Sequence, residues 1–165
     1  MDGGNLTRLQ KICKYARYLV LVLLALEVLA AIGSVAILGM LIADPGLAYP
    51  EQGMSHGYLM SMAVSNVGGM VFLIAAIYYL YRLTDSMSRE ESPFVERNVR
   101  YLKLIAVMLA VCWIIVLALR VVFSMDGSTP VSTDVTLLLM AGIIYVISLV
   151  FEYGVALQNE SDSFV

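Results

Sequence analysis

The chain has 165 residues, of which 61% are hydrophobic and 14% charged, with a mean hydropathy of +0.86. Soluble domains are closer to half apolar and a quarter charged, so this composition indicates a membrane protein. The modest net charge of −3 argues against a direct nucleic-acid binder, which would show a basic face. The length fits one compact unit, which predicts a single membrane domain over residues 1–165.

Four apolar segments predict an all-α fold, an integral membrane four-helix bundle made of two helical hairpins. Their approximate limits are residues 19–43, 58–81, 102–123 and 135–157. Each segment reaches the ~20 residues that a helix needs to cross the hydrocarbon core. The first segment is too long for the apolar core of a secretion signal, so we expect it to remain as a span.

Basic residues lie in two groups that predict the orientation of the chain. Four precede the first apolar segment, five lie within or just after the polar stretch 82–101, and the tenth is Arg120. The other two loops contain no Lys or Arg. By the positive-inside rule, we expect both termini and the loop 82–101 to be cytoplasmic. The first group also fits a short helix on anionic headgroups, although a basic flank alone orients the first span equally well.

The dipeptide Ser92-Pro93 predicts a helix start inside the polar stretch, because Ser caps free N–H groups and Pro fits the first turn. We expect this helix to continue into the third span, with Phe94 as an interfacial anchor. Near the other end of that span, Asp126 and Asp134 are the expected partners of Arg120.

Glu27 is the only acid well inside a predicted span, and it defines a candidate intramembrane polar site with Trp113, Tyr145 and Ser148. Counting inward from the span ends at ~1.5 Å per residue places these side chains at a similar depth. A carboxyl group facing lipid is costly there, so we expect Glu27 to face the interior and to hydrogen-bond one of the other three. Three interpretations stay open: a structural bond, a ligand or proton site of a sensor, or an acid reached through a water-filled crevice.

Glu152 lies a few residues before the inner end of the fourth span, at a depth similar to that of Arg17, Arg82 and Arg100. Pairing with a basic group lowers the cost of burying its charge. We therefore predict an ion pair at the inner membrane surface, with Arg100 as the candidate partner. The alternative is a Glu152 side chain that extends to water.

Ser61, Ser65 and Gly69 recur every four residues in the second span and form a stripe of small residues. Such a stripe lets two helix backbones approach closely. It fits either packing within one chain or the interface of a homo-oligomer.

The sequence contains no catalytic, cofactor-binding or metal-binding pattern, and we expect no enzymatic activity. His56 is the only histidine, lies in a loop and has no nucleophile nearby. Cys112 lies in an apolar span, where a thiol is inert. We expect Cys13 and Cys112 at different membrane levels, and therefore no disulfide between them.

Two short motifs carry a resemblance to a known family. One follows the second span and the other closes the chain: Pro93, Phe94, Glu96, Asn98, Val99 and Leu102, then Phe151, Gly154, Leu157, Gln158, Glu160, Asp162 and Val165. With its four spans, the chain resembles a bacterial family of small four-span membrane proteins catalogued as a domain of unknown function. The resemblance implies a bacterial inner-membrane protein. Because members are often encoded beside a small helix-turn-helix regulator, it also implies such a regulator as a partner.

The residues and the resemblance together favour a small multi-pass membrane protein with a regulatory or sensory role and a cytoplasmic partner. A component of an oligomeric channel or transporter is an alternative. Against it, the spans contain few polar residues and no pair of helices broken by Gly or Pro. An immunity protein against a membrane-active peptide is a third possibility.

Overall fold

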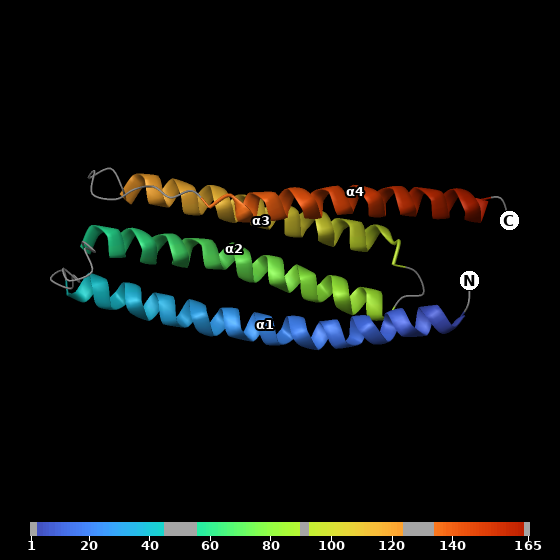
Figure 1. Ribbon diagram of the computed structural model, residues 1–165, viewed down its shortest axis with the longest axis horizontal. Coiled ribbons are helices and arrows are strands. Elements are labelled where there is room, and N and C mark those ends of the chain that lie inside the picture. The colour runs from blue at the N-terminus through green and yellow to red at the C-terminus, as the bar shows by residue number, and fades with distance from the viewer. Residues whose placement is uncertain (1–2, 45–55, 90–92, 124–133, 164–165) are drawn as a thin grey trace.

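The computed structural model describes residues 3–44, 56–89, 93–123 and 134–163, except for the side chains of residues 3–10, 123 and 162. Four long helices account for nearly all of this part of the chain (Figure 1). They are α1 (Gly3–Ala43), α2 (His56–Arg89), α3 (Glu96–Phe123) and α4 (Thr136–Ser163). The predicted all-α class with four membrane-length helices is confirmed.

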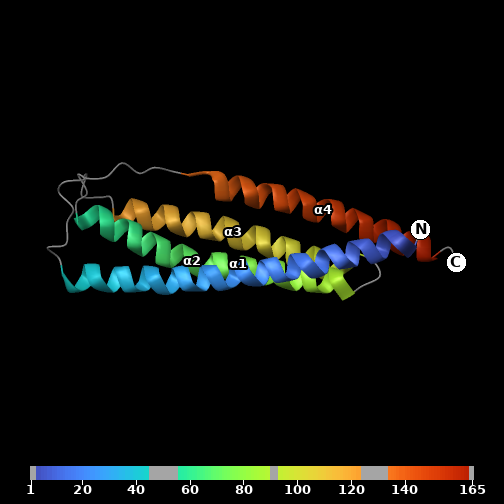
Figure 2. The same cartoon turned by 60° about the horizontal axis from the view of Figure 1, so that its bottom comes forward.

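Each helix packs against its neighbour in the sequence and runs antiparallel to it. Contacts join α1 to α2, α2 to α3 and α3 to α4, and the described parts of α1 and α4 do not touch. Figure 1 shows this order, and Figures 1 and 2 both show the start of α1 and the end of α4 at the same end of the molecule. We call this the terminal end, where α2 finishes at Arg89 and α3 begins at Glu96. We call the opposite end, where α1 finishes at Ala43 and α2 begins at His56, the far end.

The small-residue stripe of α2 is used for packing within the chain. Ser61, Ser65 and Gly69 are all buried. A Cβ atom added to Gly69 would lie 2.7 Å from Val116 Cγ2 on α3, so only glycine allows this close approach. The stripe therefore serves the first of its two expected uses. It is not available on the surface as a homo-oligomer interface.

An apolar core fills the space between α2, α3 and the first half of α4. Six buried residues form it: Ala76, Leu83, Leu102, Ile105, Leu109 and Ala141. The contributions of α2 and α3 come from the halves of these helices nearer the terminal end. The core thus makes the α2–α3 interface apolar between Ala76 and Leu83 of α2 and between Leu102 and Leu109 of α3.

The outer surfaces of the helices are strongly apolar. In the most apolar 18-residue stretch of α1, only 6% of the residues are buried. Large side chains of α1 such as Leu29 and Ile32 are exposed. Such a surface is unfavourable in water, and lipid is the solvent in which it is stable. All four helices are long and apolar enough to cross a bilayer, so the chain is a multi-pass membrane protein.

The helices extend beyond the predicted spans at the terminal end. α2 continues past Tyr81 to Arg89, and α4 continues past Leu157 to Ser163. Much of the stretch predicted as a loop, residues 82–101, is therefore helical. The last turns of α2 contain an i,i+4 pair between Asp85 and Arg89. The prediction that the helix starting near Pro93 runs into the third span is confirmed by α3.

The start of α4 lies well inside the end of α3. The indole Nε1 of Trp113 donates a hydrogen bond of 2.9 Å to the Asp134 carbonyl oxygen, which places Asp134 beside Trp113. About ten residues separate Trp113 from the end of α3 at Phe123, a length of ~15 Å at helical rise. α4 is thus displaced toward the terminal end, and it extends past the start of α3 there (Figure 1).

Candidate functional site

A polar pocket lies between the helices close to the start of α4. Its cavity volume is about 240 Å³. Its lining combines residues of α1, α2 and α3 with the start of α4: Glu27, Ser65, Asn66, Gly69, Met70, Leu73, Cys112, Trp113, Val116, Leu117, Arg120, Asp134 and Leu137. We call this cavity the Glu27 pocket. All four helices therefore contribute residues to its lining.

Glu27 is the α1 residue in this lining. Its side chain is partly buried and shares the pocket with Ser65 and Asn66 of α2 and with Trp113 of α3. Among the described residues, none donates a hydrogen bond to the Glu27 carboxyl group or forms an ion pair with it. The hydrogen-bonding capacity of this group is therefore unused within the described part of the chain.

Two of the residues predicted to meet Glu27 lie elsewhere. Ser148 is fully buried, but its hydroxyl donates a bond of 2.6 Å to the carbonyl oxygen of Tyr145 within α4. The Tyr145 side chain is 49% exposed, on the outer surface. Neither lines the pocket, so the prediction that Glu27 bonds Ser148 or Tyr145 is wrong. The displacement of α4 is the reason, because it places Asp134 rather than Ser148 at the level of Glu27.

Trp113 lines the pocket together with Glu27. Its indole N–H, however, donates its hydrogen bond to a group other than the Glu27 carboxyl. The acceptor is the carbonyl oxygen of Asp134, at 2.9 Å. The bond fixes the indole ring against the start of α4. Trp113 therefore connects the wall of the pocket directly to α4.

Asp134 caps α4 and carries a charge at the edge of the pocket. Its Oδ1 accepts a bond of 2.9 Å from the Thr136 N–H, the usual arrangement of a helix cap. The hydrogen bonds from Thr136, together with the nearby Arg120 charge, hold the pKa of Asp134 below its ordinary value, although desolvation opposes them. Asp134 and Arg120 therefore place residues of opposite formal charge in the lining of the pocket. Of the two expected partners of Arg120, Asp126 lies outside the described residues.

Glu152 does form an ion pair, as predicted, but the predicted partner, Arg100, is wrong. Lys103 Nζ lies 3.0 Å from Oε1 and 2.9 Å from Oε2 of Glu152. Lys103 is nearly one helical turn deeper along α3 than Arg100, and this turn brings its ammonium to the level of the Glu152 carboxylate. Both residues are partly exposed, so solvent weakens this pair and its role in stability is small.

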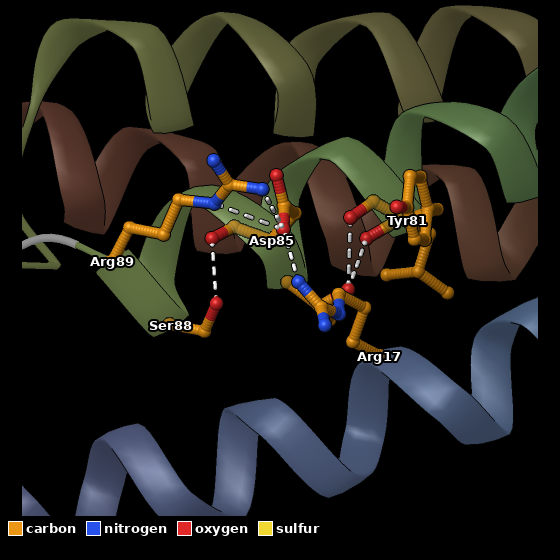
Figure 3. Close-up of polar contacts among 7 residues, drawn as sticks. Arg17, Tyr81, Asp85, Ser88 and Arg89 are labelled. Atoms are coloured by element: carbon orange, nitrogen blue, oxygen red, sulfur yellow. Dashed lines mark hydrogen bonds and ion pairs between the residues drawn. The ribbon is translucent and has the colours of Figure 1, made fainter.

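A second charged cluster, which the sequence analysis did not identify, joins α1 to α2 near the terminal end. Arg17 on α1 reaches across to Asp85 on α2, and Arg89 approaches the same carboxylate from within α2 (Figure 3). The Arg17 Nη1 to Asp85 Oδ1 distance is 2.7 Å, and both side chains are 21% exposed. Asp85 belongs to the predicted loop 82–101 but lies in α2, and its i,i+4 spacing to Arg89 is the sequence signal for a continuing helix.

The family-like motifs meet at the junction of α3 and α4. The Phe94 and Phe151 rings lie 5.3 Å apart between centroids, and a Cβ atom on Gly154 would lie 2.5 Å from Phe94 Cδ1. Buried Asn98 donates a 2.9 Å bond from Nδ2 to the carbonyl oxygen of Pro93. Glycine at position 154 is thus what allows Phe94 to pack on α4, and the motif fixes the start of α3.

The last motif residues lie on the final turns of α4. Leu157, Gln158 and Glu160 are exposed, whereas the Asp162 side chain and Val165 lie outside the described part of the structure. The end of α4 therefore presents a mainly polar surface at the terminal end.

The comparisons with known proteins identify a family but no activity. Within the described residues, no group of three or more His, Cys, Asp or Glu side chains is placed to hold a metal ion. No curated protein matches the chain, and no solved structure matches it. The profile of one family, described as "Protein of unknown function (DUF2975)", matches residues 14–165. Because this match covers nearly the whole sequence, the chain belongs to the DUF2975 family, whose function is unknown.

Proposed function

We propose that this protein is a membrane sensor that binds a small cationic molecule in the Glu27 pocket and signals through α4. One observation carries the proposal. Glu27 lines a pocket of about 240 Å³ inside the membrane-spanning region, and no described residue forms a hydrogen bond or an ion pair with its carboxyl group. Ionisable residues within spans are costly and are usually retained for function.

The charges in the pocket favour a positively charged ligand. The lining contains two acids, Glu27 and Asp134, and one base, Arg120. A carboxyl group in this position gains most from a partner that brings a positive charge. The Trp113 indole in the same lining adds a surface that attracts cations. Apolar residues such as Met70 and Leu117 accommodate a hydrocarbon portion.

α4 is the element best suited to transmit binding. Its first residues, Asp134 and Leu137, belong to the pocket, and its last turn at Ser163 lies at the terminal end. Like α1, α4 contacts only one neighbouring helix among those described, so it moves with little loss of packing. A shift of Trp113 is passed to α4 directly through its bond to Asp134.

Binding is better supported than conduction. The Glu27 pocket ends where the apolar core begins, and residues such as Leu109, Ile105 and Ala76 fill the interface from there toward the terminal end. In the described structure, these residues offer no polar groups along which an ion could move. A channel or transporter requires such a path.

We further propose that the terminal end is cytoplasmic and that the protein lies in the inner membrane of a bacterium. Nine of the ten basic residues belong to this end of the chain by position, in agreement with the positive-inside rule. The polar end of α4 is then available to a soluble partner. The family resemblance suggests a small helix-turn-helix regulator as that partner.

Cysteine labelling tests the orientation. In a background without Cys13 and Cys112, a cysteine at Asp44 is expected to react with a membrane-impermeant maleimide added to intact cells. A cysteine at Ser163 should react only after permeabilisation. Labelling of the Ser163 position in intact cells contradicts the proposed orientation.

Tryptophan fluorescence tests the ligand class, because Trp113 is the only tryptophan of the chain and lines the pocket. Titrating octylamine into the protein in nanodiscs should give a saturable change in Trp113 emission. Glu27→Gln should weaken the apparent affinity by about tenfold or more, since it removes a charged hydrogen-bond partner.

Two controls separate binding from partition into the bilayer. Glu160→Gln removes an acid from the exposed end of α4 and should leave the octylamine affinity unchanged. Octanol has the same chain without the charge. It should give the same Trp113 emission response in Glu27→Gln and in wild type. Equal octylamine responses in Glu27→Gln and wild type contradict the proposed site.

A further inference from the structure

A groove between α3 and α4 at the terminal end is separate from the Glu27 pocket. Its volume is about 550 Å³. Charged and apolar side chains line different parts of it, and six of them matter here: Glu96, Arg100, Lys103, Leu104, Val107 and Glu152. It opens on the outer surface of the helices, where the charged residues and Val107 are exposed or partly exposed.

The order of these residues along α3 follows the layers of a bilayer leaflet. Glu96 and Arg100 come first, at the terminal end, and Leu104 and Val107 follow toward the middle of the span. The distance along the axis from Glu96 to Val107 is ~16 Å at helical rise. The charged part therefore lies at headgroup depth and the apolar part at acyl-chain depth.

The charges of the groove balance. Lys103 and Glu152 are paired at 2.9 Å. This leaves Glu96 and Arg100, both exposed, for which the described structure contains no hydrogen bond or ion pair. They are four residues apart and so lie on one face of α3. A groove with two acids and two bases has no net attraction for an anionic headgroup, and it matches a headgroup that carries both signs.

We propose that this groove binds a phospholipid of the phosphatidylethanolamine type. The Arg100 guanidinium binds the phosphate, for which its forked donors are well suited. The ethanolamine ammonium donates to the Glu96 carboxylate, and one acyl chain lies along Leu104 and Val107. Phosphatidylcholine lacks the N–H donors for Glu96, and phosphatidylglycerol lacks the positive charge. This site is independent of the Glu27 pocket and of the proposed sensory function.

Native mass spectrometry of the full chain tests the assignment. The protein is released from nanodiscs that contain phosphatidylethanolamine, phosphatidylcholine and phosphatidylglycerol in equal amounts with identical acyl chains. Phosphatidylethanolamine is expected to remain bound above its bulk share. Arg100→Gln should lower this retention by about tenfold, because a charged hydrogen bond to the phosphate is lost. Glu96→Gln should lower the preference over phosphatidylcholine by about two- to fivefold.

Two further variants check that the groove is responsible. Lys14→Gln removes an exposed positive charge from α1, which does not contact α3 or α4, and should leave lipid retention unchanged. Val107→Trp fills the apolar part of the groove without changing its charges and should displace the lipid. The proposal is overturned if no lipid exceeds its bulk share, if phosphatidylglycerol is retained most, or if Arg100→Gln and Lys14→Gln have equal effects.

Discussion

Replacing Asp85 by asparagine is expected to loosen α1 from the other helices and to lower the melting temperature by about 5 °C. Asp85 accepts a bond from Arg17 at 2.7 Å, and both side chains are mostly buried between α1 and α2. The substitution leaves the Arg17 guanidinium partly buried without its counter-ion. The effect should concentrate in α1, because this helix packs only against α2. Thermal unfolding followed by circular dichroism in nanodiscs measures it.

Arg89→Gln is the matched control for this prediction. Arg89 also binds Asp85 Oδ1, at 3.1 Å, but its side chain is 70% exposed, so its pair with Asp85 contributes little. The control should therefore melt close to wild type. The double variant Arg17→Met with Asp85→Leu should recover much of the loss, since an apolar pair replaces the charges. If Asp85→Asn and Arg89→Gln melt at the same temperature, the bridge between α1 and α2 is not a stabilising contact.

Gly69→Leu is expected to lower the free energy of unfolding by about 3 kcal/mol. A Cβ atom at position 69 would lie 2.7 Å from Val116 Cγ2 and 3.4 Å from Cys112 Sγ, so the larger side chain forces α2 and α3 apart. Glycine also leaves its carbonyl oxygen accessible to the Cys112 thiol, which donates to it at 3.3 Å. Unfolding by sodium dodecyl sulfate, followed by circular dichroism, compares the variant with wild type.

Gly33→Leu supplies the control for steric effects, because a Cβ atom there meets nothing within 4 Å. It should be neutral or slightly stabilising, since leucine favours a helix more than glycine does. Adding Val116→Ala to Gly69→Ala should restore part of the stability that Gly69→Ala alone loses, because the contacting methyl group is removed. If Gly69→Leu is as stable as Gly33→Leu, the close approach of α2 and α3 at Gly69 does not contribute to stability.

The number and type of helices were predictable because each depends on residues that are neighbours in the sequence. Runs of apolar residues longer than ~20 define spans whatever lies beside them. Pro93 marked the region where α3 starts, and the spacing of Ser61, Ser65 and Gly69 marked a close helix contact. The sequence did not decide which helix would occupy that contact. The structure assigns it to α3.

The candidate site was predicted only in part. Glu27 and Trp113 were expected together and do line one pocket. The prediction of Ser148 and Tyr145 as their neighbours rests on depth along each span, which is valid only if all helices start at a common plane. Asp134 and Arg120 line the pocket instead, because α4 starts beside Trp113 rather than at the end of α3.

By itself, the sequence determined the class of protein, the four helices, the grouping of positive charge and the presence of an acid within a span. These properties follow from composition and local periodicity, which act over a few helical turns. The tertiary structure alone decided the axial displacement of α4, the choice of Lys103 over Arg100 for Glu152, and the Arg17–Asp85 bridge. Each of these depends on how far one helix slides or turns against another. Packing of residues distant in the sequence determines this, and no local pattern encodes it.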